Sequence, residues 1–241
     1  MNIINILKNK DNEVAKFPGA TIAFLGDSIT QGCFEVYKKT ATTLETVFDQ
    51  NSAYHAKLKE LLAILYPAAT INIINAGISG GSSSQGLARI DRDVIKHSPD
   101  MAVVCFGLND CHNGIEGIQE YKTNLKNIFS RLKENNIEVI FMTPNMMNIN
   151  VSCHFTDEFF VKIAEDFTKV QLGGMLDRYM DAARDVCSEE NVKICDCYKI
   201  WKSFYEGGVN ITEILSNKLN HPIRELHWIF AHELLKVMFE N

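Results

Sequence analysis

The stretch that decides the fold is TIAFLGDSITQG, residues 21–32. Its first five residues are mostly apolar and too few for a helix, which suits a strand buried in a parallel sheet. Gly26 then allows a sharp turn, and both Asp27 and Ser28 favour the start of a helix. This pattern places Ser28 at the carboxyl edge of the sheet, where open α/β sheets bind ligands. On these residues alone, an alternative is that Asp27 or Ser28 simply caps that helix and has no part in chemistry.

The rest of the chain alternates between strand and helix patterns. Further strands are predicted at residues 70–75, 101–106, 137–142 and 192–196, and helices at residues 52–66, 85–97, 117–134, 157–187 and near the C-terminus. The long helical stretch contains Gly173-Gly174, where we expect a break. The alternation predicts a doubly wound, three-layer α/β/α domain around a five-stranded parallel sheet.

We expect one domain over residues 1–241, because no repeat, low-complexity segment or linker divides the chain. Residues 1–20 form a lead-in to the first strand. Residues 33–51 mix polar and aromatic side chains without a clear period. Because this segment directly follows Ser28, it could shape a substrate pocket, or it could be a surface insertion.

The composition excludes several classes of function. A formal net charge of −6, with no long run of Lys and Arg, gives no attraction to nucleic acid or to anionic membranes. No apolar segment is long enough to span a bilayer, and the N-terminus lacks a secretory signal, so we expect a cytoplasmic protein. Seven scattered cysteines predict neither a disulfide framework nor a metal site. We expect no cofactor, and the oligomeric state stays open.

Four predicted loops carry residues that suit nucleophilic catalysis by a serine. Ser28 can supply the hydroxyl, and His221 can take its proton. The N–H groups of Ser28 and Gly80 and the side-chain amide of Asn109 can donate to an oxygen that becomes negative. Gly80 could instead be only a turn residue, and Asn109 could bond its own backbone. Three of these loops follow strands of one parallel sheet, so we expect them to meet at one edge.

Four short blocks resemble those of the SGNH hydrolases, also called the GDSL-type esterases and lipases. They are GDSI at 26–29, NAGISG at 75–80, GLND at 107–110 and HP at 221–222. The resemblance runs from about residue 20 to the last helix. It implies a flavodoxin-like α/β/α domain that hydrolyses small acyl esters through an acyl-enzyme, with O-acetyl groups on carbohydrates as one candidate substrate. It also implies Ser28 as nucleophile, His221 as base, and Ser28, Gly80 and Asn109 as the oxyanion hole.

One position departs from that family. An Asp usually stands three residues before the family's histidine, and here that position is Lys218. A lysine cannot accept the imidazole N–H. We therefore predict a Ser28–His221 dyad whose imidazole is oriented by a neutral group, either Asn217 or a main-chain oxygen. A carboxylate from elsewhere, such as Asp196, is the alternative.

Three further residues of these loops are candidate substrate contacts: Asp27, Asp110 and His112. Asp110 could instead cap its loop or the next helix, and a single loop histidine is usually solvated. Two other functions also stay open. The sheet edge could hold an anion or nucleotide in a non-catalytic, flavodoxin-like binding module, although the Ser28 turn lacks a phosphate-binding glycine motif. The chain could also be a degenerate esterase kept for protein interaction. The partner we expect is a small-molecule ester.

Overall fold

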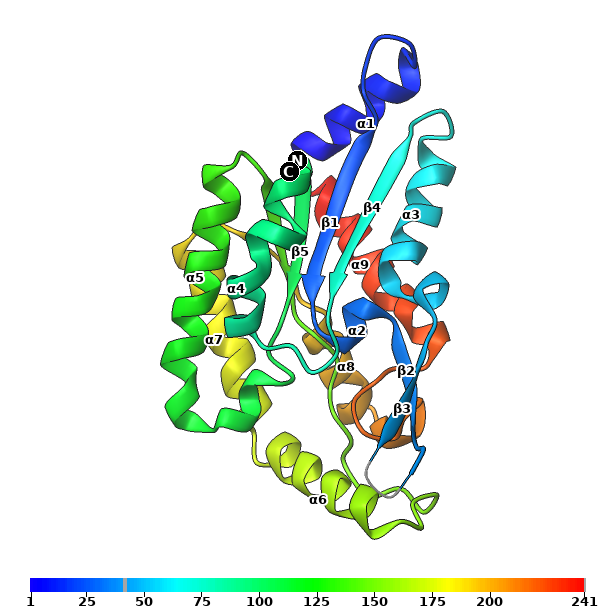
Figure 1. The fold of residues 1–241 in the computed structure, drawn as a ribbon, viewed down its shortest axis with the longest axis vertical. Coiled ribbons are helices and arrows are strands. Elements are labelled where there is room, and N and C mark those ends of the chain that lie inside the picture. The colour runs from blue at the N-terminus through cyan, green and yellow to red at the C-terminus, as the bar shows by residue number, and fades with distance from the viewer. Residues whose placement is uncertain (41–42, 241) are drawn as a thin grey trace.

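A parallel five-stranded sheet runs through the centre of the computed structural model, which describes residues 1–40 and 43–240 (Figure 1). Its strand order is β4-β1-β5-β6-β7. The strands are β1 (Ala20–Gly26), β4 (Ile71–Gly77), β5 (Met101–Cys105), β6 (Glu138–Met142) and β7 (Lys193–Cys195). Every residue of β5 is buried, as expected for a central strand covered on both faces.

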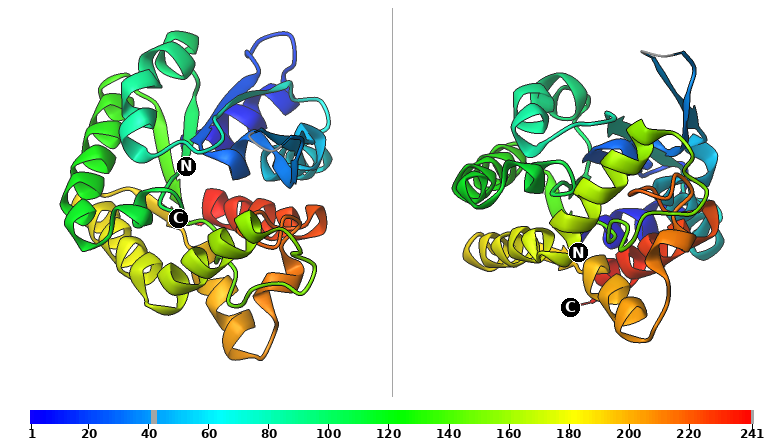
Figure 2. Two further views of the ribbon diagram at one scale, coloured as in Figure 1. Left: turned by 60° about the horizontal axis from the view of Figure 1, so that its bottom comes forward. Right: turned by 90° about the horizontal axis from the view of Figure 1, so that it is seen from below.

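Helices cover both faces of the sheet, so the predicted three-layer α/β/α fold is confirmed (Figures 1 and 2). One layer contains α4 (Ser83–Asp93), α5 (Ile118–Glu134) and α7 (Met175–Glu189). The other contains α3 (Tyr54–Leu65), α8 (Cys197–Glu206) and α9 (His227–Phe239). Within the lead-in, α1 (Asn2–Asn12) packs on β1 and α9. None of the helices in the described residues has the length and apolarity needed to cross a membrane.

Short elements complete the chain. A helix of four residues, α2 (Ser28–Gln31), follows β1 directly. The 3₁₀ turns are η1 (Gln50–Ser52), η2 (Ile95–His97), η3 (Asp110–Asn113), η4 (Ile115–Gly117), η5 (Ile211–Ile214) and η6 (Arg224–Leu226). The predicted long helix is broken at Gly173-Gly174 into α6 (Glu158–Leu172) and α7, with Gly174 at a φ of 72°. Glycine adopts this left-handed conformation without steric cost.

The switch in strand order places the carboxyl ends of β1 and β5 side by side. From β1 the chain passes to β4 on one side of it and then crosses to β5 on the other side. Such a switch point is where open α/β sheets bind ligands. Ser28 follows β1, and Asn109 follows β5. Two residues far apart in the sequence therefore reach the same edge of the sheet.

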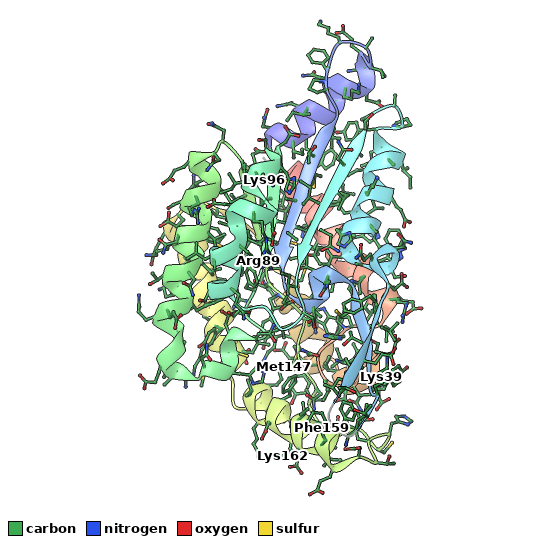
Figure 3. The ribbon with its side chains drawn as sticks, in the orientation of Figure 1. Lys39, Arg89, Lys96, Met147, Phe159 and Lys162 are labelled. Carbon is green, nitrogen blue, oxygen red and sulfur yellow. The ribbon has the colours of Figure 1, made fainter. Side chains whose placement is uncertain are left out.

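Residues 33–51, which had no clear pattern, contain an antiparallel hairpin of β2 (Cys33–Lys38) and β3 (Leu44–Phe48). The hairpin projects past the carboxyl edge of the main sheet, and α6 crosses the same end of the molecule (Figures 1 and 2). An ion pair of 2.8 Å joins Lys38 to Asp157 at the start of α6. The Lys38 ammonium also lies 5.7 Å from the ring centroid of Phe159, labelled in Figure 3. The hairpin and α6 thus support each other beside the loop that holds Ser28.

Candidate active site

Ser28 and His221 meet although 193 positions separate them in the sequence. Ser28 is the first residue of α2, which begins there because the Asp27 carboxylate accepts the Ile29 N–H at 2.9 Å. His221 lies in the loop between η5 and η6, and its Nε2 is 3.0 Å from Ser28 Oγ. Only 4% of Ser28 and 5% of His221 is exposed. The two candidate catalytic side chains therefore form a largely enclosed hydrogen-bonded pair.

A main-chain oxygen orients the imidazole. His221 Nδ1 lies 2.9 Å from the carbonyl oxygen of Phe34, in β2. A carbonyl only accepts, so Nδ1 carries the proton and Nε2 has a free lone pair for the Ser28 hydroxyl. Burial lowers the pKa of His221 to about 4, against a smaller raising effect of the Phe34 hydrogen bond, so the ring is neutral at pH 7. This is the tautomer that a base for Ser28 needs.

Asn217 does not contact the imidazole, so the expectation that its side chain orients the ring is wrong. Its Oδ1 instead accepts the main-chain N–H groups of Leu219, Asn220 and His221 at 3.0, 3.0 and 2.9 Å. A short amide side chain folds back in this way because it can mimic a backbone turn. Asn217 therefore shapes the loop that carries His221, through the backbone.

The alternative of Asp196 as a displaced acid is also wrong. Its carboxylate accepts from Arg184 Nε at 2.9 Å and Nη2 at 3.0 Å, and from the Thr143 hydroxyl at 3.0 Å. It also caps the start of α8. None of its hydrogen bonds within the described residues reaches His221, so Asp196 has a structural role at the end of β7.

The candidate oxyanion donors come from the loops after three adjacent strands. The Ser28 N–H begins α2, where the first N–H groups have no acceptor inside the helix. Gly80 is exposed at a φ of 73°, and in the described part of the chain its N–H donates to no acceptor. Asn109 donates one amide hydrogen to the Gly81 carbonyl at 2.9 Å, which leaves its second hydrogen available. Asn109 thus also ties the loop after β5 to the loop after β4.

Buried charged side chains brace the same loops. The Arg89 guanidinium, on α4, donates to the carbonyl oxygens of Ala76 at 2.6 Å and Gly26 at 2.8 Å, the ends of β4 and β1 (Figure 3). Asp110 accepts the N–H and hydroxyl of Ser83, at the start of α4, at 2.9 and 2.5 Å. Sequence analysis missed Arg89, because an arginine in an amphipathic helix ordinarily points to solvent.

Asp27 and Asp110 are buried carboxyls that hold the starts of two helices, and their contact with substrate stays a prediction. Each uses one oxygen at the start of a helix, and in each the other oxygen is buried without a partner in the described part of the chain. Burial raises the pKa of Asp27 to about 7, and the nearby Asp110 charge adds to this effect. Burial also raises the pKa of Asp110. Asp110 does act as a cap, but of α4, which precedes it in the chain, and not of its own loop or the next helix.

His112, the third candidate contact, lies on η3 just beyond Asn109. Its ring packs against Phe167 of α6, with 4.6 Å between the ring centroids. Burial lowers the pKa of His112. His112 therefore connects the loop after β5 with the helix that crosses this end of the molecule, and its contact with substrate stays a prediction.

Comparison with known proteins identifies a family whose profile matches most of this chain. The profile of the GDSL-like Lipase/Acylhydrolase family matches residues 24–229. An acetylxylan esterase of Geobacillus stearothermophilus is 28% identical over 135 residues, which are 52% of this chain and 60% of that protein. The thioesterase 1/protease 1/lysophospholipase L1 of Escherichia coli K12 is 28% identical over 152 residues, 61% of this chain and 62% of that protein. The matches thus span about six tenths of these two relatives.

Among solved structures, the crystal structure of an acetylxylan esterase from Geobacillus stearothermophilus superposes with a TM-score of 0.68 at 22% identity. The superposition covers 93% of this chain and 96% of that one, which shows a shared fold. Catalytic mutants of that esterase replace a serine, an aspartate and a histidine, the last two standing three positions apart. The corresponding spacing from His221 leads here to Lys218, whose ammonium donates to Glu213.

Proposed function

Since the chain belongs to the GDSL-like lipase/acylhydrolase family, we propose that it is a serine esterase that hydrolyses small acyl esters through an acyl-enzyme. The observation that carries the proposal is the hydrogen-bonded series from Ser28 Oγ through His221 to the Phe34 carbonyl, with distances of 3.0 and 2.9 Å. In this series the Phe34 carbonyl accepts the Nδ1–H of His221, so Nε2 is free to take the proton of Ser28, as acyl transfer requires.

In the first half of the reaction, Ser28 Oγ attacks the ester carbonyl carbon while its proton moves to His221 Nε2. The imidazolium that forms keeps its Nδ1–H on the Phe34 oxygen. It then gives the Nε2 proton to the leaving alcohol as the carbon–oxygen bond breaks. In the second half, water attacks the acyl-enzyme with His221 again as base, and Ser28 regains its proton as the carboxylic acid leaves.

The negative oxygen of each tetrahedral intermediate is held by three donors: the N–H groups of Ser28 and Gly80 and the free amide hydrogen of Asn109. Two observations support this assignment. The Gly80 N–H is exposed and uncommitted among the described residues, and Asn109 is fixed in place by its bond to Gly81. Donors that need no rearrangement when charge develops are the most effective in catalysis.

For the substrate, we propose short acyl esters, with acetyl groups on carbohydrates as the first class to test. Acetylxylan esterases are among the relatives with similar sequence and among the structures with similar fold.

The experiment combines a fluorophosphonate probe with a panel of esters that differ in acyl length and in alcohol. We expect the probe to label the native protein at Ser28 and acetyl esters to be hydrolysed fastest. Ser28→Ala should abolish labelling, and His221→Ala should lower turnover by about 10³-fold or more, as loss of the base does in serine hydrolases. Circular dichroism checks that both variants are folded. An unlabelled native protein, or activity of either variant within tenfold of wild type, would contradict the proposal.

A further inference from the structure

Arg224, three residues beyond His221, contacts the hairpin and Asp49, the residue that follows it. Its Nη1 and Nη2 donate to the two oxygens of Glu35 at 2.6 and 3.0 Å, and its Nε donates to Asp49 at 3.0 Å. The guanidinium carbon also lies 4.3 Å from the ring centroid of Phe34. We call this group of Arg224, Glu35, Asp49 and the Phe34 ring the Arg224 clamp.

The clamp holds the two residues that share one peptide group. The carbonyl of Phe34 is bonded to the nitrogen of Glu35, so fixing the Phe34 ring and the Glu35 carboxylate fixes the peptide unit between them. That carbonyl oxygen is the one that faces His221 Nδ1 at 2.9 Å. The Phe34 ring also packs against His227 of α9, with 4.9 Å between ring centroids. The oxygen is therefore positioned from both sides.

We propose that Arg224 is a positioning residue that, through Glu35 and Phe34, aligns the main-chain oxygen which takes the place of the absent triad carboxylate. This inference rests on the proposed function. Arg224 suits the task because the planar guanidinium binds a carboxylate through two parallel hydrogen bonds and stacks on an aromatic ring. It also joins the two parts of the site, since Arg224 belongs to the segment of His221 and Glu35 to the hairpin.

The charges around His221 fit this arrangement. From β2, the Glu35 carboxylate acts to raise the pKa of His221, although burial dominates and lowers it. Two other charged groups near this region, Arg224 and the Asp49 carboxylate, form an ion pair with each other. His227 adds no charge, because burial lowers its pKa to about 3. Arg224 thus partly neutralises the carboxylates beside the imidazole. Without it, Glu35 would raise the pKa of His221 further.

The chain offers a matched control. Arg184 binds Asp196 through Nε and Nη2, in a similar two-bond pair. The side chains of Arg184 and Asp196 are 33% and 23% exposed, against 34% and 24% for Arg224 and Glu35. The Arg184 pair lies at the end of β7 and touches neither Ser28 nor His221. Any loss of stability or activity that comes simply from removing a half-buried arginine should therefore appear equally in variants of Arg224 and of Arg184.

The test compares Arg224→Met, Arg224→Lys and Arg184→Met with wild type. We expect Arg224→Met to lower kcat by about 10- to 100-fold with little change in KM, as a small misplacement of a catalytic group does. Arg224→Lys should recover part of this loss, because lysine keeps the charge but not the two-bond geometry. In Arg224→Met the acid limb of kcat/KM should also move to higher pH. Arg184→Met should keep the wild-type kcat.

A second readout needs no substrate. In NMR spectra of protein with ¹⁵N-labelled histidine, we expect the His221 Nδ1–H to be protected from exchange in wild type and in Arg184→Met, and to lose protection in Arg224→Met. Equal kcat and equal protection in Arg224→Met and Arg184→Met would overturn the clamp while leaving the esterase intact. If wild type neither hydrolyses esters nor reacts with a fluorophosphonate, the proposed function fails, and the NMR comparison still decides whether Arg224 orients the imidazole.

Discussion

At the scale of single residues, Asn109 has two tasks, and kinetics can show whether the one proposed in catalysis is real. Its amide holds the Gly81 carbonyl, and its other hydrogen is proposed to meet the negative oxygen of the intermediate. We expect Asn109→Ala to lower kcat by ~10²–10³, the usual cost of one oxyanion donor, with KM changed far less. Asn109→Asp keeps the size of the side chain but lacks a donor, so it should be no more active. Steady-state kinetics on an acetyl ester measures both, and a change confined to KM would make Asn109 a loop-shaping residue only.

His221 gives a second prediction at this scale. Because burial lowers its pKa to about 4, the imidazole stays neutral and able to act as base well below its ordinary value of 6.5. The kcat/KM for an uncharged ester should therefore stay level from pH 7 down to about pH 5 and fall only near pH 4. Circular dichroism in the same buffers separates loss of the base from unfolding. An acid limb centred near pH 6.5 in a folded protein would show that the imidazole is solvated.

At the scale of elements, α2, the helix that begins with Ser28, rests directly on the end of β4. A Cβ on Gly77 would lie 2.2 Å from the Gln31 nitrogen and 2.7 Å from the Thr30 carbonyl carbon, both main-chain atoms of α2. Gly77→Ala must therefore displace the helix that begins with Ser28. We expect a loss of roughly 1–3 kcal/mol in the free energy of unfolding and a lower kcat.

Gly86→Ala is the control for that prediction. A Cβ there would meet the Phe106 ring at 2.4 Å, on the α4 side of the sheet, so it also crowds the core. Urea unfolding should show that both variants are destabilised, while the rate of fluorophosphonate labelling at Ser28 should fall more in Gly77→Ala. Equal labelling rates in the two variants would mean that contact with β4 does not set the position of α2.

At the scale of the whole molecule, buried histidines link stability to pH. Burial lowers the pKa of His55 to about 4 and that of His227 to about 3, and the Nε2 of each is buried without a partner in the described residues. In the unfolded chain both titrate near 6.5, so the unfolded state binds more protons between pH 6.5 and about 4. Their contribution to stability is therefore complete above pH 6.5 and is lost as the pH falls through this window. Asp27, whose pKa is raised to about 7, acts in the opposite direction from pH 3.8 to 7.

We expect the free energy of unfolding to rise from pH 4 to pH 6.5, because the three histidines His55, His227 and His221 outnumber the two carboxyls with raised pKa values, Asp27 and Asp110. His55→Phe should reduce the slope by about one proton, or ~1.4 kcal/mol per pH unit. The change suits the site, since His55 packs against the Phe24 ring, with 5.6 Å between the ring centroids. Urea denaturation at a series of pH values gives the slope, and an unchanged slope would show that His55 is not buried as a neutral ring.

The sequence by itself determined the parts of this protein that depend on local pattern. Alternating strand and helix periods predict the parallel sheet and its two helical layers, and Gly173-Gly174 marks the break between α6 and α7. The blocks that end β1, β4 and β5 indicate the family and the edge at which Ser28 and Asn109 lie. Such features can be predicted because the alternation of side chains and the conformational freedom of glycine act over a few residues.

Only the tertiary structure decided what orients the imidazole of His221, the proposed base. The acceptor of the His221 Nδ1–H is the backbone oxygen of Phe34, which has the same chemistry as every other carbonyl and leaves no mark in the sequence. Its selection depends on the path of the hairpin and on Arg224, which reaches Glu35 across 189 positions. The burial of Asp27 depends likewise on packing between distant segments. Contacts between residues so far apart in the chain form only when the protein folds, so a local sequence pattern does not identify them.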